Sequence, residues 1–448
     1  MLLVFASAIP SALSLAHVQP SPWMLLPFVV LLLGIALMPL VAARFWEHHY
    51  PKVAVTLGLI TAGYYVLGLH QGDAVWHALT EYGAFMALIG SLYVISGGIN
   101  IRVRGPASPV GNTLFLLMGA CLANLIGTTG ASMLLIRPWI RMNQQRITAY
   151  HIVFFIFVVS NCGGCLTPIG DPPLFLGFLR GVPFWWVMGH VWMAWVLCLG
   201  LLLAVFYALD VRNFRHAPQQ DVVVPAAGEE TWFLRGRHNV LLLAVVLVGV
   251  FLPQEWRLSA GAWYVSAGSL LMLGAAVVSY LSTPKQVHEA NDFNFHPVKE
   301  VGWLFIGIFL TMMPALDLLA SGQGLQLETP LQVYFASGAL SAFLDNAPTY
   351  LAFLAAEMGH FQLQVSRKED VLQFLDLHPG FVVAISLGSV FFGAGSYIGN
   401  GPNFMVKAIA EKAQVQTPSF LGYLFGYSLP ILVPILAVVG WLMLRAAH

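Results

Sequence analysis

Three aspartates occur inside apolar stretches of the sequence, where an ionisable side chain is costly. Asp171 lies in "TPIGDPPLF", Asp345 in "LDNAPTY" and Asp317 in "TMMPALDLL". A charged side chain at the centre of a bilayer costs about 2.5–3.5 kcal/mol on insertion scales, so such residues usually have a function. The stretches quoted for Asp171 and Asp345 contain no Lys or Arg. These two carboxylates therefore favour the binding of a proton or a cation.

Each aspartate also has a purely structural interpretation. Asp171 could be a buried acid that accepts hydrogen bonds from backbone N–H groups, and Asp345 could be the N-cap of a helix at a hairpin tip. Asp317 lies nearer the outer end of its apolar stretch, where it could face interfacial water. We keep all three as candidates for ion or proton binding.

Glycines and prolines interrupt two apolar stretches. Proline prevents a continuous helix, and glycine permits the backbone angles of an unwound segment. Unwound backbone at membrane depth is tolerated where it is buried in protein or lines a cavity, and its carbonyls can then bind an ion or a substrate. The breaking residues are Gly163, Gly164, Pro168, Gly170, Pro172 and Pro173 in the first stretch and Gly399, Gly401 and Pro402 in the second.

Neutral side-chain oxygens accompany both breaks and two further polar segments. Hard cations prefer oxygen ligands. A single Asn or Thr in a membrane helix is more often an interhelical hydrogen bond than a ligand, and that alternative stays open here. The candidates are Asn124, Thr128, Thr129, Asn161, Thr167, Asn346, Thr349, Ser396, Asn400 and Asn403.

The composition places these residues in a membrane. The chain is 58% hydrophobic and 9% charged, whereas soluble domains carry roughly 25% charged residues. The recurring apolar runs predict an all-α polytopic membrane protein with about ten spans. The lipid bilayer is the expected partner, and the net charge of zero indicates no nucleic acid. The expected spans are about 24–43, 53–69, 80–98, 149–178, 184–209, 239–252, 262–281, 301–319, 378–410 and 418–443.

Two further apolar segments, about 109–136 and 330–357, could be spans or re-entrant hairpins. The distribution of Lys and Arg distinguishes these arrangements, because cytoplasmic loops carry the excess of positive charge. With two hairpins and the mature N-terminus outside, 15 Lys and Arg lie inside and 5 outside. With two full crossings, 8 lie inside and 12 outside. We therefore expect hairpins.

A weak internal repeat supports this arrangement. "TPIGDPPLF" (167–175) aligns with "SYIGNGPNF" (396–404) at an offset of 229, which places Asp171 opposite Asn400. "ANLIGTTGAS" (123–132) aligns loosely with "LDNAPTY" at an offset of 222. The first hairpin would enter from the cytoplasm and the second from outside. The two halves would then have inverted topology, as in many secondary transporters.

The expected organisation is two membrane halves joined by a polar segment. Residues 1–16 predict a signal peptide or an extra helix. Cys162 and Cys165 form a CxxC without a second such pair, so we expect close packing of small residues there and no cofactor. The expected parts are the first half 24–209 with the broken helix 149–178, the cytoplasmic linker 210–238, and the second half 239–445 with the broken helix 378–410.

A buried carboxylate surrounded by oxygens can hold a proton or Na⁺, but not both well, because burial disfavours an uncompensated charge. If only the loaded forms change sides, this competition becomes exchange. We therefore expect a Na⁺ (or Li⁺)/H⁺ antiporter and no enzyme, with Asp171 and Asp345 as cation ligands. One alternative is Na⁺- or H⁺-coupled uptake of citrate or a dicarboxylate, which half-helix N-termini would favour. A remote alternative is an intramembrane aspartyl protease.

The segments "SNCGGCLTPIGDPPLFLGFLRGVPFWW", "GIFLTMMPALDLL" and "LDNAPTYLAFL" resemble the NhaD-type sodium/proton antiporters and their citrate-carrier-like relatives in the ion transporter superfamily. The resemblance implies an inverted-repeat fold and a homodimer in a bacterial inner membrane. At the first hairpin tip, the pattern in NhaD-type sequences is similar to "DNTT", whereas this chain has "NLIGTTGAS" without the Asp. After the first break they resemble "GDVTT", and this chain has "GDPPL". Dicarboxylate carriers resemble "TPIGTPPN", with Thr in place of Asp171.

Overall fold

The computed structural model describes residues 20–103, 108–216, 232–252, 257–260, 263–320 and 327–445. The described chain is mainly helical, with two short antiparallel strand pairs. Seven of its helices are long and apolar enough to cross a membrane, or eight if one bent pair counts as a single span. The protein is therefore an all-α polytopic membrane protein. The predicted signal peptide or extra helix at 1–16 lies outside the described residues, as does 217–231 of the predicted linker.

The described residues of the first half form seven α-helices. They are α1 (Leu26–Val41), α2 (Ala43–Gly63), α3 (Gly72–Gly97), α4 (Pro109–Met142), α5 (Ala149–Val158), α6 (Pro172–Leu179) and α7 (Phe184–His216). Short 3₁₀ or π segments accompany them: η1 (Pro22–Leu25), η2 (Tyr64–Gly68) and η3 (Cys162–Leu166). The strand β1 (Asn100–Val103) pairs with β2 (Trp232–Arg235).

The second half of the described chain is also mainly helical. Its helices are α8 (His238–Phe251), α9 (Ala267–Ser282), α10 (Lys285–Ala290), α11 (His296–Thr311), α12 (Met313–Ala320), α13 (Pro330–Ser341), α14 (Asn346–His360), α15 (Lys368–Leu377), α16 (Pro379–Phe392), α17 (Gly401–Lys412), α18 (Phe420–Tyr423) and α19 (Val433–Leu444). Its short helical segments are η4 (Gly393–Gly395) and η5 (Leu424–Leu432). The strands β3 (Arg257–Ala260) and β4 (Trp263–Ser266) form a hairpin.

Each of the ten expected spans overlaps at least one of these helices. The helix α7 continues to His216, past the predicted end of its span at residue 209. The two expected broken helices correspond to α5–η3–α6 and α16–η4–α17. In each of them, two helices are separated by a short irregular segment.

The helix α4 folds back on itself at Gly127. A straight helix of its 34 residues would be about 51 Å long, yet Asn112 near its start donates a hydrogen bond of 2.7 Å to Asn143 just past its end. Gly127 has φ 76° and ψ 154°, a conformation that favours glycine. The two arms of α4, residues 109–126 and 128–142, therefore form a helical hairpin.

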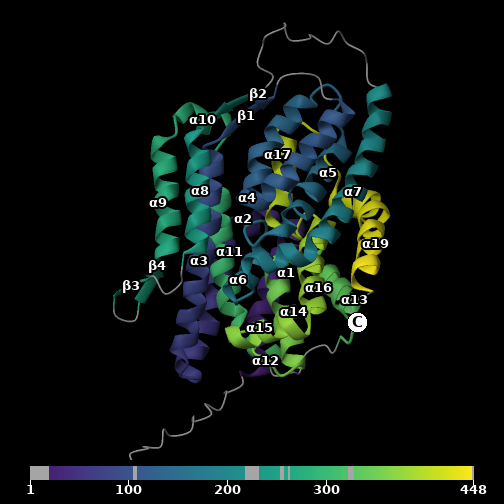
Figure 1. The fold of residues 1–448 in the computed structure, drawn as a ribbon. Helices are drawn as coiled ribbons and strands as arrows, with labels where there is room; N and C mark the ends of the chain where they lie inside the picture. The colour runs from purple at the N-terminus through teal and green to yellow at the C-terminus, as the bar shows by residue number, and fades with distance from the viewer. Residues whose placement is uncertain are drawn as a thin grey trace, which may run out of the picture.

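A second hairpin consists of α13 and α14, joined by residues 342–345. In Figure 1 the arms of α4 lie in the upper half of the molecule, whereas α13 and α14 lie in the lower half. The two hairpins thus approach the middle of the protein from opposite ends. The two broken helices lie in the part of the molecule between these two ends.

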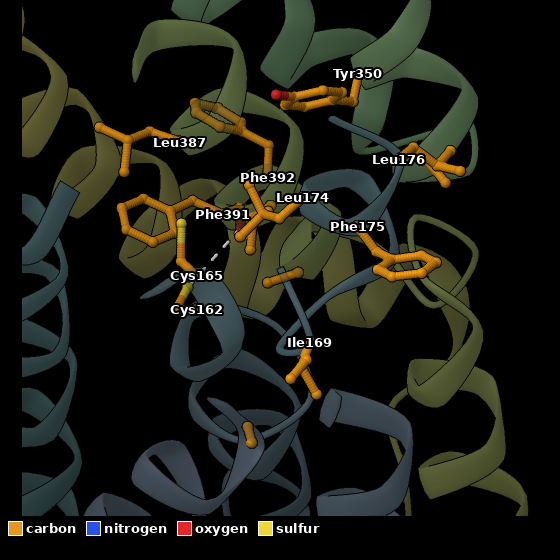
Figure 2. Close-up of a cluster of buried hydrophobic side chains, with 14 of the residues drawn as sticks. Cys162, Cys165, Ile169, Leu174, Phe175, Leu176, Tyr350, Leu387, Phe391 and Phe392 are labelled. Carbon is orange, nitrogen blue, oxygen red and sulfur yellow. Dashed lines mark hydrogen bonds between the residues drawn. The ribbon is translucent and has the colours of Figure 1, made fainter. Parts of the chain in front are cut away.

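The apolar core surrounds the two breaks. Every residue of α5 from His151 to Val158 is buried, and so are most residues of α16. Figure 2 shows this cluster, in which the Cys162 Sγ of the first break lies 4.0 Å from the Phe391 carbonyl oxygen of α16. Because apolar side chains from both halves enclose the breaks, the unwound backbone is shielded from lipid, as membrane depth requires.

Candidate functional site

The carboxylate of Asp171 is the meeting point of both hairpins and both breaks. It is 1% exposed, and its Oδ1 accepts hydrogen bonds from Thr128 Oγ1 at 2.6 Å and Asn400 Nδ2 at 3.1 Å. Its Oδ2 accepts a hydrogen bond from Asn346 Nδ2 at 2.5 Å. Thr128 belongs to the first hairpin, Asn346 to the second hairpin and Asn400 to the second break. One carboxylate thus connects four segments that are far apart in the sequence.

An amide network joins the two breaks behind this carboxylate. Asn400 Nδ2 also lies 3.1 Å from the Asn161 Oδ1 and 3.1 Å from the Ser160 carbonyl oxygen. Asn161 in turn donates to Asn403 Oδ1 at 2.7 Å. Asn403 donates to the carbonyl oxygens of Gly393 and Ser396. Amide side chains therefore provide the hydrogen bonds that unwound backbone loses when a helix is interrupted.

The first break is held in place by the first hairpin. Asn124 accepts from the Leu166 backbone N–H at 2.9 Å and donates to the Gly163 carbonyl at 2.7 Å. Thr167 Oγ1 donates to the Asn124 carbonyl at 2.7 Å. The Thr128 backbone N–H donates to the Gly170 carbonyl at 2.8 Å. Asn124 and Thr167 therefore fix the unwound backbone, while Thr128 reaches the carboxylate.

The second break repeats this arrangement at the sequence offset of 229. Thr167 corresponds to Ser396, whose Oγ donates to the Ala342 carbonyl of the second hairpin. A Cβ at Gly170 would lie 2.0 Å from the Gly164 carbonyl oxygen, and a Cβ at the equivalent Gly399 would lie 2.6 Å from the Gly393 carbonyl oxygen. Only glycine allows these approaches, because real Cβ contacts under 3.0 Å essentially do not occur. The internal repeat is therefore present in the backbone.

Proline defines where each broken helix resumes. Pro172 and Pro402 lie in the first turn of α6 and α17, where the missing N–H is not needed. Asp171 and Asn400 are the preceding N-cap residues, and both have extended backbone. Pro168 and Pro173 add to the first break, and Gly401 is the first residue of α17. The breaks thus present the two equivalent N-cap side chains to each other.

Asp171 and the three residues that donate to its carboxylate all lie at helix N-termini. Asp171 and Asn400 cap α6 and α17, Asn346 begins α14, and Thr128 begins the second arm of α4. A helix N-terminus carries a partial positive charge of about one half. In the described part of the chain no Lys or Arg donates a hydrogen bond to this carboxylate. Within the described chain, the side chains that donate hydrogen bonds to this carboxylate are therefore all neutral.

The oxygen atoms around Asp171 fit a proton or a hard monovalent cation better than a transition metal. No group of three His, Cys, Asp or Glu side chains that could hold a metal ion is found within the described ranges. Asn346 is fully buried, and its Oδ1 has no hydrogen-bond partner in this part of the chain. Because Asn346 also contacts Asp171 through Nδ2, this free oxygen and the carboxylate are available together as ligands.

Four of the expected site residues lie away from the Asp171 carboxylate or make hydrogen bonds within their own helix. Asp345 is the N-cap of α14 and accepts from the Ala347 N–H at 3.0 Å, and Thr349 Oγ1 donates to the Asp345 carbonyl. Thr129 lines a cavity of about 10 Å³ between α3 and the first hairpin tip. Asp317 is exposed and accepts from the Tyr65 hydroxyl at 2.5 Å. Of the three aspartates, Asp171 is the one at the centre of the network.

Three buried acids were not singled out by the sequence analysis, and one of them, Glu81, pairs with Arg180. Asp210, near the end of α7, binds Arg146 and accepts hydrogen bonds from Tyr150 and Asn112 at the base of the first hairpin. Glu357 on α14 is 1% exposed. The available signal for Glu357 was its position inside the apolar segment 330–357. Asp210 gave no such signal, because it lies where the polar linker was expected to begin.

Apolar spans, two opposed hairpins and a polar centre between two broken helices define a membrane transporter. The chain belongs to the family described as "Putative citrate transport", whose model matches residues 17–444. It is also similar to a "46 kDa membrane protein" of Mycobacterium leprae (strain TN). The two are 22% identical over 321 residues, which cover 69% of this chain and 72% of that protein.

Proposed function

We propose that this transporter exchanges Na⁺ or Li⁺ for H⁺ at Asp171. The observation that carries the proposal is the buried Asp171 carboxylate, which accepts three hydrogen bonds from neutral donors and none from Lys or Arg of the described chain. An ionised carboxylate in such a place needs a compensating charge. A proton or a small cation supplies that charge, and the two compete for the same oxygens.

The ligands of the cation would be Asp171 and the neighbouring neutral oxygens. Asn346 Oδ1 and Thr128 Oγ1 belong to side chains that contact the carboxylate directly. When the carboxylate takes up a proton, it becomes a poor cation ligand, so cation release follows protonation. Asp345 would add negative charge at the tip of the second hairpin. This competition is the physical basis of antiport in the proposal.

Alternating access would use the two hairpins in turn. Both tips contact Asp171, and they approach it from opposite ends of the molecule. We assign the end with Arg137 and Lys412 to the cytoplasm, because basic residues concentrate on that side of membrane proteins. The mature N-terminus would then lie outside. The resemblance to NhaD-type antiporters supports a homodimer in a bacterial inner membrane.

A second candidate is Na⁺- or H⁺-coupled uptake of citrate or another carboxylate. The description of the family favours it. So do the four helix N-termini around Asp171, which can attract an anionic group. The Asp171 carboxylate opposes it, since it would repel an anion unless a proton or Na⁺ neutralised the site. In both candidates Asp171 is the site of the coupling ion.

Everted membrane vesicles separate the two functions. With the vesicle interior acidified by respiration, Na⁺, Li⁺, K⁺ and citrate are added one at a time, and a pH-sensitive dye reports proton movement. Antiport predicts alkalinisation of the interior after Na⁺ or Li⁺. An absence of response to every cation, together with uptake of labelled citrate in right-side-out vesicles, would replace antiport by symport.

A further inference from the structure

Glu357 is a buried carboxylate outside the Asp171 network. It is 1% exposed, and both of its carboxylate oxygens have no hydrogen-bond partner among the described residues. Leaving a buried polar group without a partner costs about 1–3 kcal/mol, and more for a charged group. A side chain kept under these conditions in a transporter is a candidate for a functional role, and Glu357 belongs to the hairpin that contacts Asp171.

Glu357 shares one face of α14 with two other polar residues. Tyr350 follows Asn346 by four positions and Glu357 follows it by eleven. At 100° per residue these three side chains point in nearly the same direction, about 6 Å and 16 Å along the helix axis from Asn346. Because helical side chains lean toward the N-terminus of their helix, Glu357 leans toward Tyr350 and toward the hairpin tip. The stripe ends at the Asp171 site, where Asn346 contacts the carboxylate.

The polar atoms along this stripe lack partners as well. The Tyr350 hydroxyl and the Asn346 Oδ1 are buried and unpaired within the described chain, and so are the hydroxyls of Ser386 and Ser389 on α16. Together with the two oxygens of Glu357, these atoms all belong to α14 and α16, which pack against each other. Tyr350 lies near Ser386 and against Gly177 of α6, on the α14 side of the cluster in Figure 2. Unpaired polar atoms thus occur on two helices that pack against each other.

Among the described residues, no charged side chain accounts for this acid. Burial is the only influence of the protein on the Glu357 carboxyl group that this part of the chain shows. Of the helices packed against α14, α6 and α16 contain no titratable residue. On α12, Asp317 is exposed, and on α13, Tyr334 donates to the Leu436 carbonyl. His360, at the end of α14, is also exposed. Within the described ranges, no ion pair therefore explains why a Glu is buried at position 357.

We propose that Glu357 is a proton-relay site between the outer end of the second hairpin and Asp171. This proposal rests on the proposed function, in that it assumes proton-coupled transport. A proton leaves the Glu357 carboxyl group, whose O–H bond breaks, and reaches the Asp171 carboxylate through water and the Tyr350 hydroxyl, each of which accepts one proton and releases another. Water is needed because Glu357 and Tyr350 lie about 10 Å apart along the helix axis and share no hydrogen bond in the described chain. Reprotonation of Glu357 from the outer face restores the relay, so that one proton enters for each proton delivered.

The first test is a titration that needs no transport. Purified full-length wild type and Glu357→Gln are compared by infrared difference spectroscopy between acidic and alkaline buffer. We expect a carboxylic acid C=O stretching band in the wild type that titrates with pH and is missing from the variant. Identical difference spectra would overturn the proposal, because a relay group has to gain and lose a proton.

The second test separates proton delivery from cation binding. In proteoliposomes, Glu357→Gln should slow Na⁺-driven proton movement by about tenfold or more, while exchange of radiolabelled Na⁺ for unlabelled Na⁺ continues at the wild-type rate. Tyr350→Phe, which removes only the hydroxyl, should have the same selective effect. The matched control is Glu328→Gln, because Glu328 is exposed just before the first arm of the same hairpin. Equal loss of both activities, or loss of neither, would refute the relay.

Failure of the proposed function is distinguishable from failure of the relay. If wild type moves no protons with Na⁺ or Li⁺, antiport fails, and the same variants are then measured for proton-driven citrate uptake against citrate/citrate exchange. Selective loss of the proton-driven mode would still support Glu357 as the relay. The infrared titration decides on Glu357 whichever substrate is transported.

Discussion

Asn400 and Asp171 are 229 residues apart, and Asn400 Nδ2 donates a hydrogen bond of 3.1 Å to Asp171 Oδ1. The same number is the offset that aligns the two broken helices in the sequence. The two residues are thus equivalent N-caps of inverted repeats that meet at the centre of the molecule. The repeat carries a carboxylate in one half and its neutral amide counterpart in the other. A single negative charge at this junction is what the exchange proposal requires.

Replacing Asp171 with Asn should abolish ion exchange without unfolding the protein. The amide has nearly the same shape, and it occurs naturally at the equivalent position 400. It can bind neither a proton nor a cation with comparable strength. We expect no dye response to Na⁺ or Li⁺ in everted vesicles, with normal membrane levels and a normal size-exclusion profile. Wild-type exchange kinetics in this variant would contradict the assigned role.

Thr128→Val should weaken the site without removing it. The substitution keeps the shape of the side chain and deletes the hydroxyl that donates to Asp171 Oδ1 at 2.6 Å. A hydrogen bond to a charged group contributes about 1.5–3 kcal/mol, so the carboxylate should hold its proton more tightly against Na⁺. The pH profile of exchange should move upward by about one pH unit, with a higher apparent KM for Na⁺. Thr128→Ser, which keeps the hydroxyl, is the control and should retain the wild-type profile.

Gly170→Ala should destabilise the protein or prevent its accumulation. The added Cβ would lie 2.0 Å from the Gly164 carbonyl oxygen, which is backbone and cannot rotate away. Overpacking of this kind typically costs about 1–3 kcal/mol. Gly274→Ala on α9 is the matched control, because nothing lies within 4 Å of its new Cβ. The melting temperature in detergent should fall for the first variant only. An unchanged value for Gly170→Ala would mean that the break can relax.

Asp292, which follows α10, interacts with Lys412 at the end of α17 and with Arg137 of α4, and its contribution to stability should depend on pH. The hydrogen bond from Lys412, with further attraction from Arg137, holds the pKa of the Asp292 carboxyl below its usual value. A group whose pKa is lowered by folding stabilises the protein above its unfolded pKa, and this stabilisation is lost as the pH falls through the folded pKa. The melting temperatures of wild type and Asp292→Asn should therefore differ near neutral pH and converge in acid. Equal melting temperatures at neutral pH would show that the exposed pair contributes nothing, as many surface ion pairs do.

Much of the fold could be predicted from local sequence. Long apolar runs indicate spans because every backbone group in lipid has to be paired within a helix. Glycine and proline indicate the interruptions because they act through their own φ angle and missing N–H, without help from distant residues. The segment "TPIGDPPLF" and its counterpart "SYIGNGPNF" therefore identify both breaks from the sequence alone.

Which polar side chains meet is decided by the tertiary structure. The donors to Asp171 come from positions 128, 346 and 400, and no local rule connects residues so far apart. Asp345 and Asn346 are neighbours in the sequence, yet they have different roles at the start of α14. Asp345 is the N-cap of the helix, whereas Asn346 donates a hydrogen bond to Asp171. Asp317 has an apolar context like that of Asp171, but its helix places it on an exposed surface. Sequence determined where the chain breaks and which residues are polar there, because both depend on single residues. Only packing of the two halves against each other determined which of them share a site.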